Sequence, residues 1–178
     1  MPHKDTKKIL KPTVHASVFV AEGARIFGEV EIGEGSSVWF NAVIRGDEGG
    51  IIIGKHTNIQ ENAVVHTDLG TGTLIGDEVT IGHGAIIRGC KIGRGVMIGM
   101  NATVMSHAEI GEDSIVGANA VIPYRAKFPP RSVILGMPAK RVRELKTEEL
   151  GTGRLIAQIY KELMQKYKEK KILGYTEK

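Results

Sequence analysis

The side chains of this 178-residue chain that could carry out chemistry are imidazoles, guanidiniums and carboxylates rather than thiols. A single cysteine, Cys90, excludes an internal disulfide and any cysteine-rich metal cage, and we interpret it as a small inert thiol. The chain has six histidines, and imidazole both binds metal ions and transfers protons near neutral pH. Whether a histidine meets an arginine or a carboxylate depends on the elements that position it.

Aliphatic residues recur every six positions through most of the chain, in runs that start at Val14, Ile53, Ile75 and Ile92. A period of six fits neither an α-helix nor a simple alternating strand, but it suits a parallel β-helix with short flat faces. Much of the glycine, 23 residues in all, follows these aliphatic residues directly, where the backbone must turn or approach another closely: Gly33, Gly54, Gly76, Gly82, Gly93, Gly99, Gly111 and Gly117.

This pattern resembles the hexapeptide repeat of left-handed β-helix proteins, and it covers residues 14 to about 125. Three repeats form one triangular coil in that family, so the resemblance implies an all-β, left-handed parallel β-helix of about six coils. Longer spacings predict small outward loops around residues 47–50 and 68–72. We expect an N-terminal extension (1–13), the β-helix domain (14–140), and a C-terminal segment (141–178) whose α-helix packs on the β-helix.

Coils stack at the distance between strands, about 4.8 Å, so equivalent positions of successive coils form columns. Arg45, His66 and Arg88 each follow the third aliphatic marker of their coil, which places them in one column. Glu61 and His83 fall in a different column, two residues after the second marker. We therefore expect His66 and His83 to stay apart within one chain, although they could meet between two copies.

Three stretches, VWFNAVIRGDEG (38–49), NIQENAVVH (58–66) and TIGHGAIIRGC (80–90), together with the later GMPAKRVREL, resemble the γ-class carbonic anhydrase family in order and over essentially the whole chain. Members of that family are homotrimers that hold zinc at each subunit interface through three histidines from two chains. The resemblance implies that His66 and His83 are two of these ligands. The third ligand position is occupied by Arg88.

Arg88 is a departure with chemical consequences, because a guanidinium has no available lone pair and its charge repels a metal ion. Catalytic zinc usually has three protein ligands and a water whose pKa it lowers to about 7. We therefore expect weakened metal binding, by zinc or by iron, since both suit imidazole. Arg88 could instead hold a carboxylate such as Glu61 across the interface, or form an anion pocket for bicarbonate or a carboxylate.

The resemblance also implies roles for other residues. Arg45 and Asp47 match a charged pair that joins subunits, and we favour this structural role over a catalytic one. Gln60 matches a residue that hydrogen-bonds the metal-bound water, Glu61 an acidic neighbour at the interface, and Glu48 a glutamate near the substrate in some members. The acidic proton-shuttle loop of one branch is missing after His66. We interpret the remaining histidines as surface or corner residues: His3, His15, His56 and His107.

Three functions compete at this point. The first is reversible hydration of CO₂ to bicarbonate at an intersubunit zinc site. The second is a metal-poor, inactive trimer that serves as a binding or scaffold protein. The third, an acyl-CoA transferase or thioesterase, has less support because no extended loop with a catalytic histidine is evident.

The basic charge of the chain lies in its tail. Residues 140–178 carry a net charge of +5 and the first 139 residues a net charge of −1, so lysines on the solvated face of a helix explain the pI near 9.2 better than a nucleic-acid groove does. Thr147, followed by Glu148 and Glu149, predicts the N-cap of that helix. No apolar run approaches a membrane span, and the lysine-rich N-terminus lacks a signal core, which predicts a cytoplasmic protein without a membrane partner.

Overall fold

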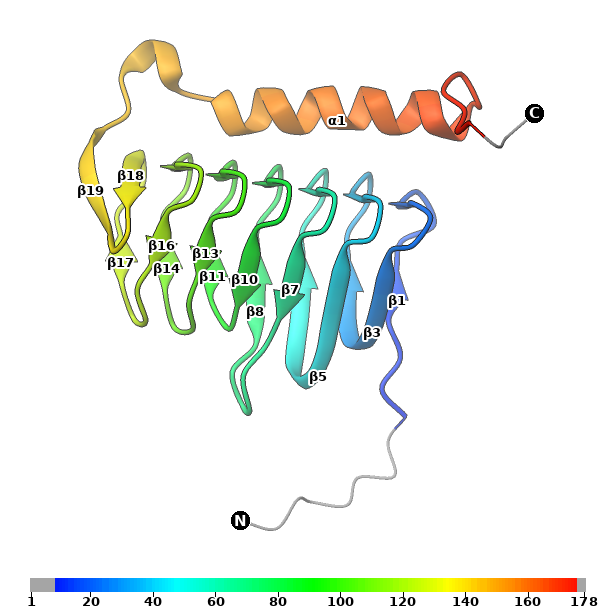
Figure 1. Cartoon of the computed structure of the whole chain (residues 1–178), viewed down its shortest axis with the longest axis horizontal. Helices are drawn as coiled ribbons and strands as arrows, with labels where there is room; N and C mark the ends of the chain where they lie inside the picture. Colours follow the sequence, from blue (N-terminus) through cyan, green and yellow to red (C-terminus); the bar gives the residue numbers. More distant parts are fainter. Residues whose placement is uncertain (1–8, 176–178) are drawn as a thin grey trace.

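The computed structural model describes residues 9–175, so His3 and most of the predicted N-terminal extension lie outside it. The chain forms a parallel β-helix of about seven turns with a single α-helix near the C-terminus, which confirms the predicted fold class (Figure 1). The turn beyond the expected six arises because the inward-facing positions continue through Phe128 and Ile134, which pair with Ile110 and Val116.

Three faces make up the β-helix. The first face contains β2 (Phe19–Val20), β4 (Ser37–Val38), β6 (Asn58–Ile59), β9 (Thr80–Ile81), β12 (Met97–Ile98), β15 (Ile115–Val116) and β18 (Ser132–Gly136). The second face contains the first halves of β3 (Arg25–Ile32) and β5 (Val43–Ile53), and then β7 (Val64–His66), β10 (Ile86–Arg88), β13 (Thr103–Val104) and β16 (Val121–Ile122). The third face contains β1 (Thr13–Val14), the second halves of β3 and β5, β8 (Thr73–Ile75), β11 (Lys91–Ile92), β14 (Glu109–Ile110) and β17 (Lys127–Phe128).

The core is a ladder of aliphatic side chains that point inward from each face. Ile44, Val65 and Ile87 stack in register on the second face, and all three are fully buried. Small residues fill the crowded corners beside them, as Ala42, Ala63 and Ala85 do. The hexapeptide spacing thus reflects one large and one small buried side chain per face, which is why the core needs few aromatic residues.

Glycine after the inward aliphatic residue lets successive coils stack at these positions. A Cβ atom at Gly99 would lie 2.5 Å from the backbone nitrogen of Ala118 and 2.7 Å from the carbonyl carbon of Gly117. Both contacts are with backbone atoms, which cannot move aside as a flexible side chain could. The predicted close backbone approach is therefore confirmed at this position.

One of the two predicted loops is a strand instead. Residues 47–50 belong to β5, which continues without interruption around the corner between the second and third faces. Strand β3 turns the same corner, and the two strands pair on both sides of it, with one register shift between Gly28 and Val30. The prediction of a loop there was wrong, because the extra residues continue a strand that pairs with β3 on either side of them. The other loop is present, closed by a bridge between Asp68 and Thr71.

The last strand, β19 (Ala139–Glu144), reverses direction and pairs antiparallel with β18 at the end of the β-helix. A 3₁₀ turn (Thr147–Glu149) follows, and α1 begins only at Thr152. Thr147 is therefore not the N-cap of the α-helix; Gly151, with φ of 81°, occupies that position. The delayed start brings the helix down onto the β-helix, since a Cβ at Gly153 would lie 2.2 Å from the carbonyl oxygen of Gly95.

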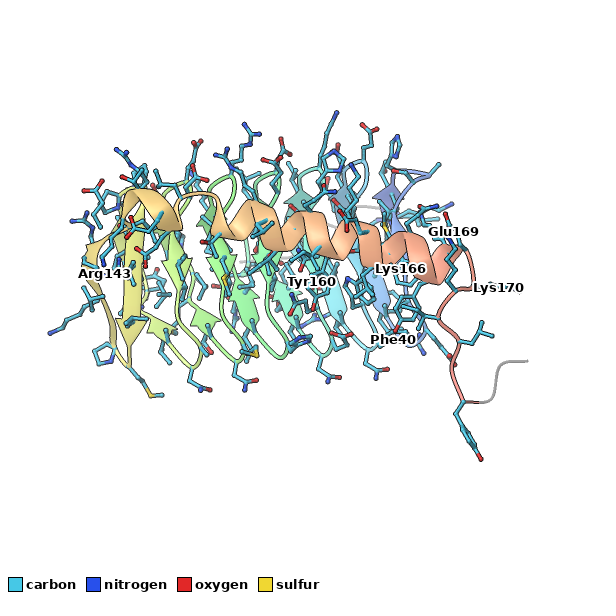
Figure 2. All side chains as sticks on the ribbon, turned by 90° about the horizontal axis from the view of Figure 1, so that it is seen from above. Phe40, Arg143, Tyr160, Lys166, Glu169 and Lys170 are labelled. Atoms are coloured by element: carbon cyan, nitrogen blue, oxygen red, sulfur yellow. The ribbon has the colours of Figure 1, made fainter. Side chains whose placement is uncertain are left out.

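Helix α1 (Thr152–Lys168) lies lengthwise along the β-helix and contacts β4, β6 and β9 (Figures 1 and 2). Trp39 is only 1% exposed, and the rings of Phe19, Tyr160 and Tyr167 pack around it at centroid distances of 5.2 to 5.4 Å. The apolar stripe of the helix is thus a docking face for the first coils. Tyr160 comes from the middle of this helix (Figure 2), which brings its hydroxyl to the corner that carries His83.

A small pH effect on stability is expected where β19 leads into the 3₁₀ turn. Glu149 receives two hydrogen bonds from the Arg143 guanidinium, at 2.6 and 2.7 Å, and one from the Lys146 amide, and these contacts lower its pKa to about 2. In the unfolded chain the Glu149 carboxyl has a pKa of about 4.3. The contribution of the Glu149 contacts to stability is therefore present above that pH and is lost as the pH falls toward 2. We expect Glu149→Gln to lower the melting temperature by a few degrees at pH 7 and by much less at pH 2.5.

Thermal unfolding followed by circular dichroism across this pH range tests the effect, with Glu148→Gln as the matched control. Glu148 contacts Lys146 only at 4.0 Å and is largely exposed. If both variants lose the same stability at every pH, the Arg143–Glu149 pair does not stabilise this segment.

Candidate functional site

The second face brings the predicted column together. Arg45 on β5, His66 on β7 and Arg88 on β10 pair in register as direct neighbours. Strand alternation explains why all three point outward, because each follows a fully buried aliphatic residue. A histidine thus lies between two arginines on a ladder whose spacing is set by the β-helix.

The hydrogen bonds of His66 determine its tautomer. Its Nδ1 lies 2.8 Å from the carbonyl oxygen of Arg45, which only accepts, so Nδ1 carries the proton. Its Nε2 lies 2.8 Å from an Nη atom of Arg45, which only donates, so Nε2 presents its lone pair. Arg45 of the neighbouring coil thus contacts both ring nitrogens, and the His66 side chain is only 14% exposed.

Two carboxylates follow Arg45 along β5. Asp47 accepts a hydrogen bond of 2.6 Å from the Arg45 guanidinium, which keeps the pKa of Asp47 below its usual value. The Glu48 carboxylate instead approaches the histidine, with Oε2 at 3.6 Å from Nε2 of His66. Within a single chain, Arg45 and Asp47 thus pair with each other, and Glu48 extends toward the imidazole.

Arg88 forms an ion pair with Asp68, in the loop that follows β7. Asp68 also accepts a hydrogen bond from the Ser106 hydroxyl, and these two contacts, with the hydroxyl first, lower its pKa. The carboxylate that Arg88 holds is therefore one of its own chain. Sequence reasoning missed Asp68 and Ser106, since 38 residues separate them and neither belongs to the matched motifs.

His83 lies at the corner between the first and second faces and has its own carboxylate. Its Nδ1 lies 2.6 Å from Oε2 of Glu61, a close contact that lacks the geometry of a hydrogen bond. The Tyr160 hydroxyl lies 3.5 Å from Nε2 of His83, and burial together with the Glu61 charge raises the pKa of Tyr160. Gln60, 4% exposed, accepts from the His83 amide and donates to Asn58, which fixes the backbone of this corner.

The two histidines remain in separate columns, as expected from the register. Within residues 9–175, no three side chains of the metal-binding types converge in one chain. Of the other three described histidines, His15 bonds Ser17, His107 packs its ring edge-on against Tyr124, and His56 donates its backbone amide to Glu34. Cys90 is buried, which raises the pKa of its thiol to about 12 and makes it unreactive.

In metal-ligating histidines, one ring nitrogen commonly donates to a carbonyl or carboxylate and the other presents its lone pair. His66 contacts the Arg45 carbonyl in this way, and Nδ1 of His83 lies close to the Glu61 carboxylate. The site of one chain is thus two half-sites on adjacent faces, each able to offer an imidazole to an ion or to a second protein chain.

The fold and these half-sites define a hexapeptide-repeat β-helix protein, and residues 89–123 match the family described as bacterial transferase hexapeptide (six repeats). The chain is 56% identical to a probable carbonic anhydrase of Methanocaldococcus jannaschii over 77% of its own length and 86% of that protein. It is 40% identical to a carbonic anhydrase of Geobacillus kaustophilus, over 88% and 86% of the two chains. The chain belongs to the γ-class carbonic anhydrase-like family of hexapeptide-repeat proteins.

Solved structures agree on the fold. A hexapeptide transferase family protein from Anaplasma phagocytophilum superimposes with a TM-score of 0.84 at 38% identity, covering 88% of this chain and 92% of the other. In the described part of the chain, no helix has the length and apolar character needed to cross a membrane.

Proposed function

We propose that this protein catalyses the reversible hydration of CO₂ to bicarbonate at a metal site shared between subunits, with His66 from one chain and His83 from its neighbour. One observation carries the proposal. Nδ1 of each ring lies against an oxygen, the Arg45 carbonyl for His66 and the Glu61 carboxylate for His83, so that a metal would bind through Nε2, which on His66 now contacts the Arg45 guanidinium. Two fixed imidazoles that do not meet within one chain are what an intersubunit metal site requires.

The donor set suits zinc or iron, because neutral imidazole nitrogen is a ligand that both metals accept. A bound divalent metal supplies Lewis acidity, which makes water acidic enough to yield a nucleophile near neutral pH. Arg45 shields Nε2 of His66 in the single chain, so its guanidinium would give up this contact when the metal binds and keep Asp47 as its partner.

The remaining residues of the site orient its parts. Gln60 and Glu61 fix the corner and the ring of His83. Tyr160 closes one side of that ring and reaches it from the helix, so that docking of α1 completes the half-site. The partners we propose are two further copies of this chain, which assemble with it as a homotrimer. We place the protein in the cytoplasm, where thiols such as that of Cys90 stay reduced.

The test is metal analysis and stopped-flow CO₂ hydration on protein purified without added metal. We expect close to one zinc or iron per chain, loss of activity after chelation, and its return when either metal is added back. A trimer that holds no metal and gains no activity from added zinc or iron would overturn the proposal, and the chain would then be the metal-poor scaffold. Hydrolysis or transfer of acyl groups from acyl-CoA, without CO₂ hydration, would also overturn it.

A further inference from the structure

We infer that the Glu48 carboxylate supplies the third protein ligand of the metal, in place of Arg88; the inference rests on the proposed function. The position that carries an imidazole in the related enzymes carries a guanidinium here, which cannot donate a lone pair. A metal held by His66 and by His83 of the partner subunit would lack one protein ligand unless another side chain provides it. Carboxylate oxygen is an established ligand of both zinc and iron.

The distance between Glu48 and His66 favours joint coordination. Oε2 of Glu48 lies 3.6 Å from Nε2 of His66. Metal bonds of about 2.0 to 2.2 Å at a tetrahedral angle separate two ligand atoms by roughly 3.4 Å. The observed separation is therefore close to the one that a shared ion would impose. It is longer than the separation of two hydrogen-bonded atoms.

Arg88 and the two competing carboxylates around this corner are engaged with other partners in the described structure. Arg88 is drawn to Asp68, whose carboxylate also accepts from Ser106, so that the guanidinium is anchored on the loop after β7. Asp47 is held by Arg45. Of the three acidic side chains near the ring, Asp47 and Asp68 have an arginine partner, while the Glu48 contact is with His66.

The backbone of Glu48 is fixed by the strand that continues around the corner. Its carbonyl oxygen accepts a hydrogen bond from Gly70 at 3.1 Å, which ties β5 to the loop of the next coil. A Cβ at Gly46 would lie 2.5 Å from the Glu29 carbonyl oxygen, so this glycine lets β3 and β5 approach closely where the turn begins. Strand pairing on both sides of the corner and the hydrogen bond from Gly70 hold the Glu48 backbone near His66.

The experiment measures metal affinity in the full-length trimer by competition of Zn²⁺ and Co²⁺ with a chromophoric chelator. We expect Glu48→Gln to weaken affinity about 100-fold or more, since removal of a supporting group alone costs 10- to 100-fold. The visible absorption of the Co²⁺ protein, which reports the ligand set, should change as well. Arg88→His should alter affinity by less than about 3-fold, because the third position is already filled.

Glu31→Gln on the third face is the matched control, since it removes the same charge far from His66. Circular dichroism and light scattering verify that each variant folds and assembles. If His66→Ala abolishes metal binding while Glu48→Gln keeps both the affinity and the Co²⁺ spectrum, the role of Glu48 is refuted and the proposed function stands. If the natural protein binds neither metal, both are refuted.

Discussion

We expect the His66→Ala and His83→Ala variants, each inactive alone, to regain CO₂ hydration activity when the two chains are assembled together. In the proposed homotrimer, each variant lacks one imidazole at every interface. In a mixed cyclic trimer, an interface with His66 from one chain and His83 from the other is intact, and random mixing produces this combination at about a quarter of the interfaces. Stopped-flow CO₂ hydration of the co-refolded variants measures the recovery.

Native mass spectrometry establishes that the mixed trimers form, and His15→Ala mixed with His83→Ala provides the control for mixing. The His15 ring hydrogen-bonds to the hydroxyl and the backbone amide of Ser17, away from both half-sites. The His15→Ala variant should therefore be active alone. The decisive comparison is between co-refolded and separately refolded samples of the two site variants. Mixed trimers without recovered activity would show that His66 and His83 do not share an interface site.

A large loss of stability is expected from Gly99→Ala. The new Cβ would meet backbone atoms of Gly117 and Ala118 in the next coil at 2.5 to 2.9 Å. Relief requires the two coils to separate, which breaks contacts of the buried Ile98 and Val116. Overpacking of this kind costs about 3 kcal/mol, and the melting temperature should fall by about 10 °C.

Thermal and urea unfolding of the assembled protein at a fixed chain concentration test this value. Gly50→Ala is the matched control, because its Cβ would meet only the flexible Glu29 side chain at 3.8 Å or beyond. Equal melting temperatures for the two variants would mean that the coils have room to spare at Gly99, contrary to the close stacking described here.

Much of the fold was predictable because the six-residue period determines it residue by residue. The markers from Ile32 onward, such as Ile44 and Val65, are buried, and the residue after Ile44, Val65 or Ile87 points outward, so the column of Arg45, His66 and Arg88 follows from counting along the chain. The separate column of His83 follows in the same way. The family motifs then indicate which of these outward positions carry chemistry.

The rest depends on contacts that no period encodes. Residues 47–50 form a strand because β3 turns the same corner, and extra length in one coil does not reveal whether its neighbour follows. Asp68 reaches Arg88 and Ser106 only through the loop conformation, and Tyr160 reaches His83 across 77 residues through helix docking. Thr147 has the residue type and acidic neighbours of an N-cap, but the helix starts where Gly153 lets it approach Gly95.

The antiparallel β19 also governs how copies of this protein can meet. A parallel β-helix has two open ends, and each could serve as a template for further strands of another copy. Here the final strand of the first face reverses and presents Lys140, Arg141 and Arg143 at that end. A parallel strand of another copy would meet this strand running in the opposite direction, with charged side chains along it, of which Arg141 and Arg143 pair with Glu144 and Glu149. Growth into a filament by continued parallel stacking is therefore disfavoured at this end.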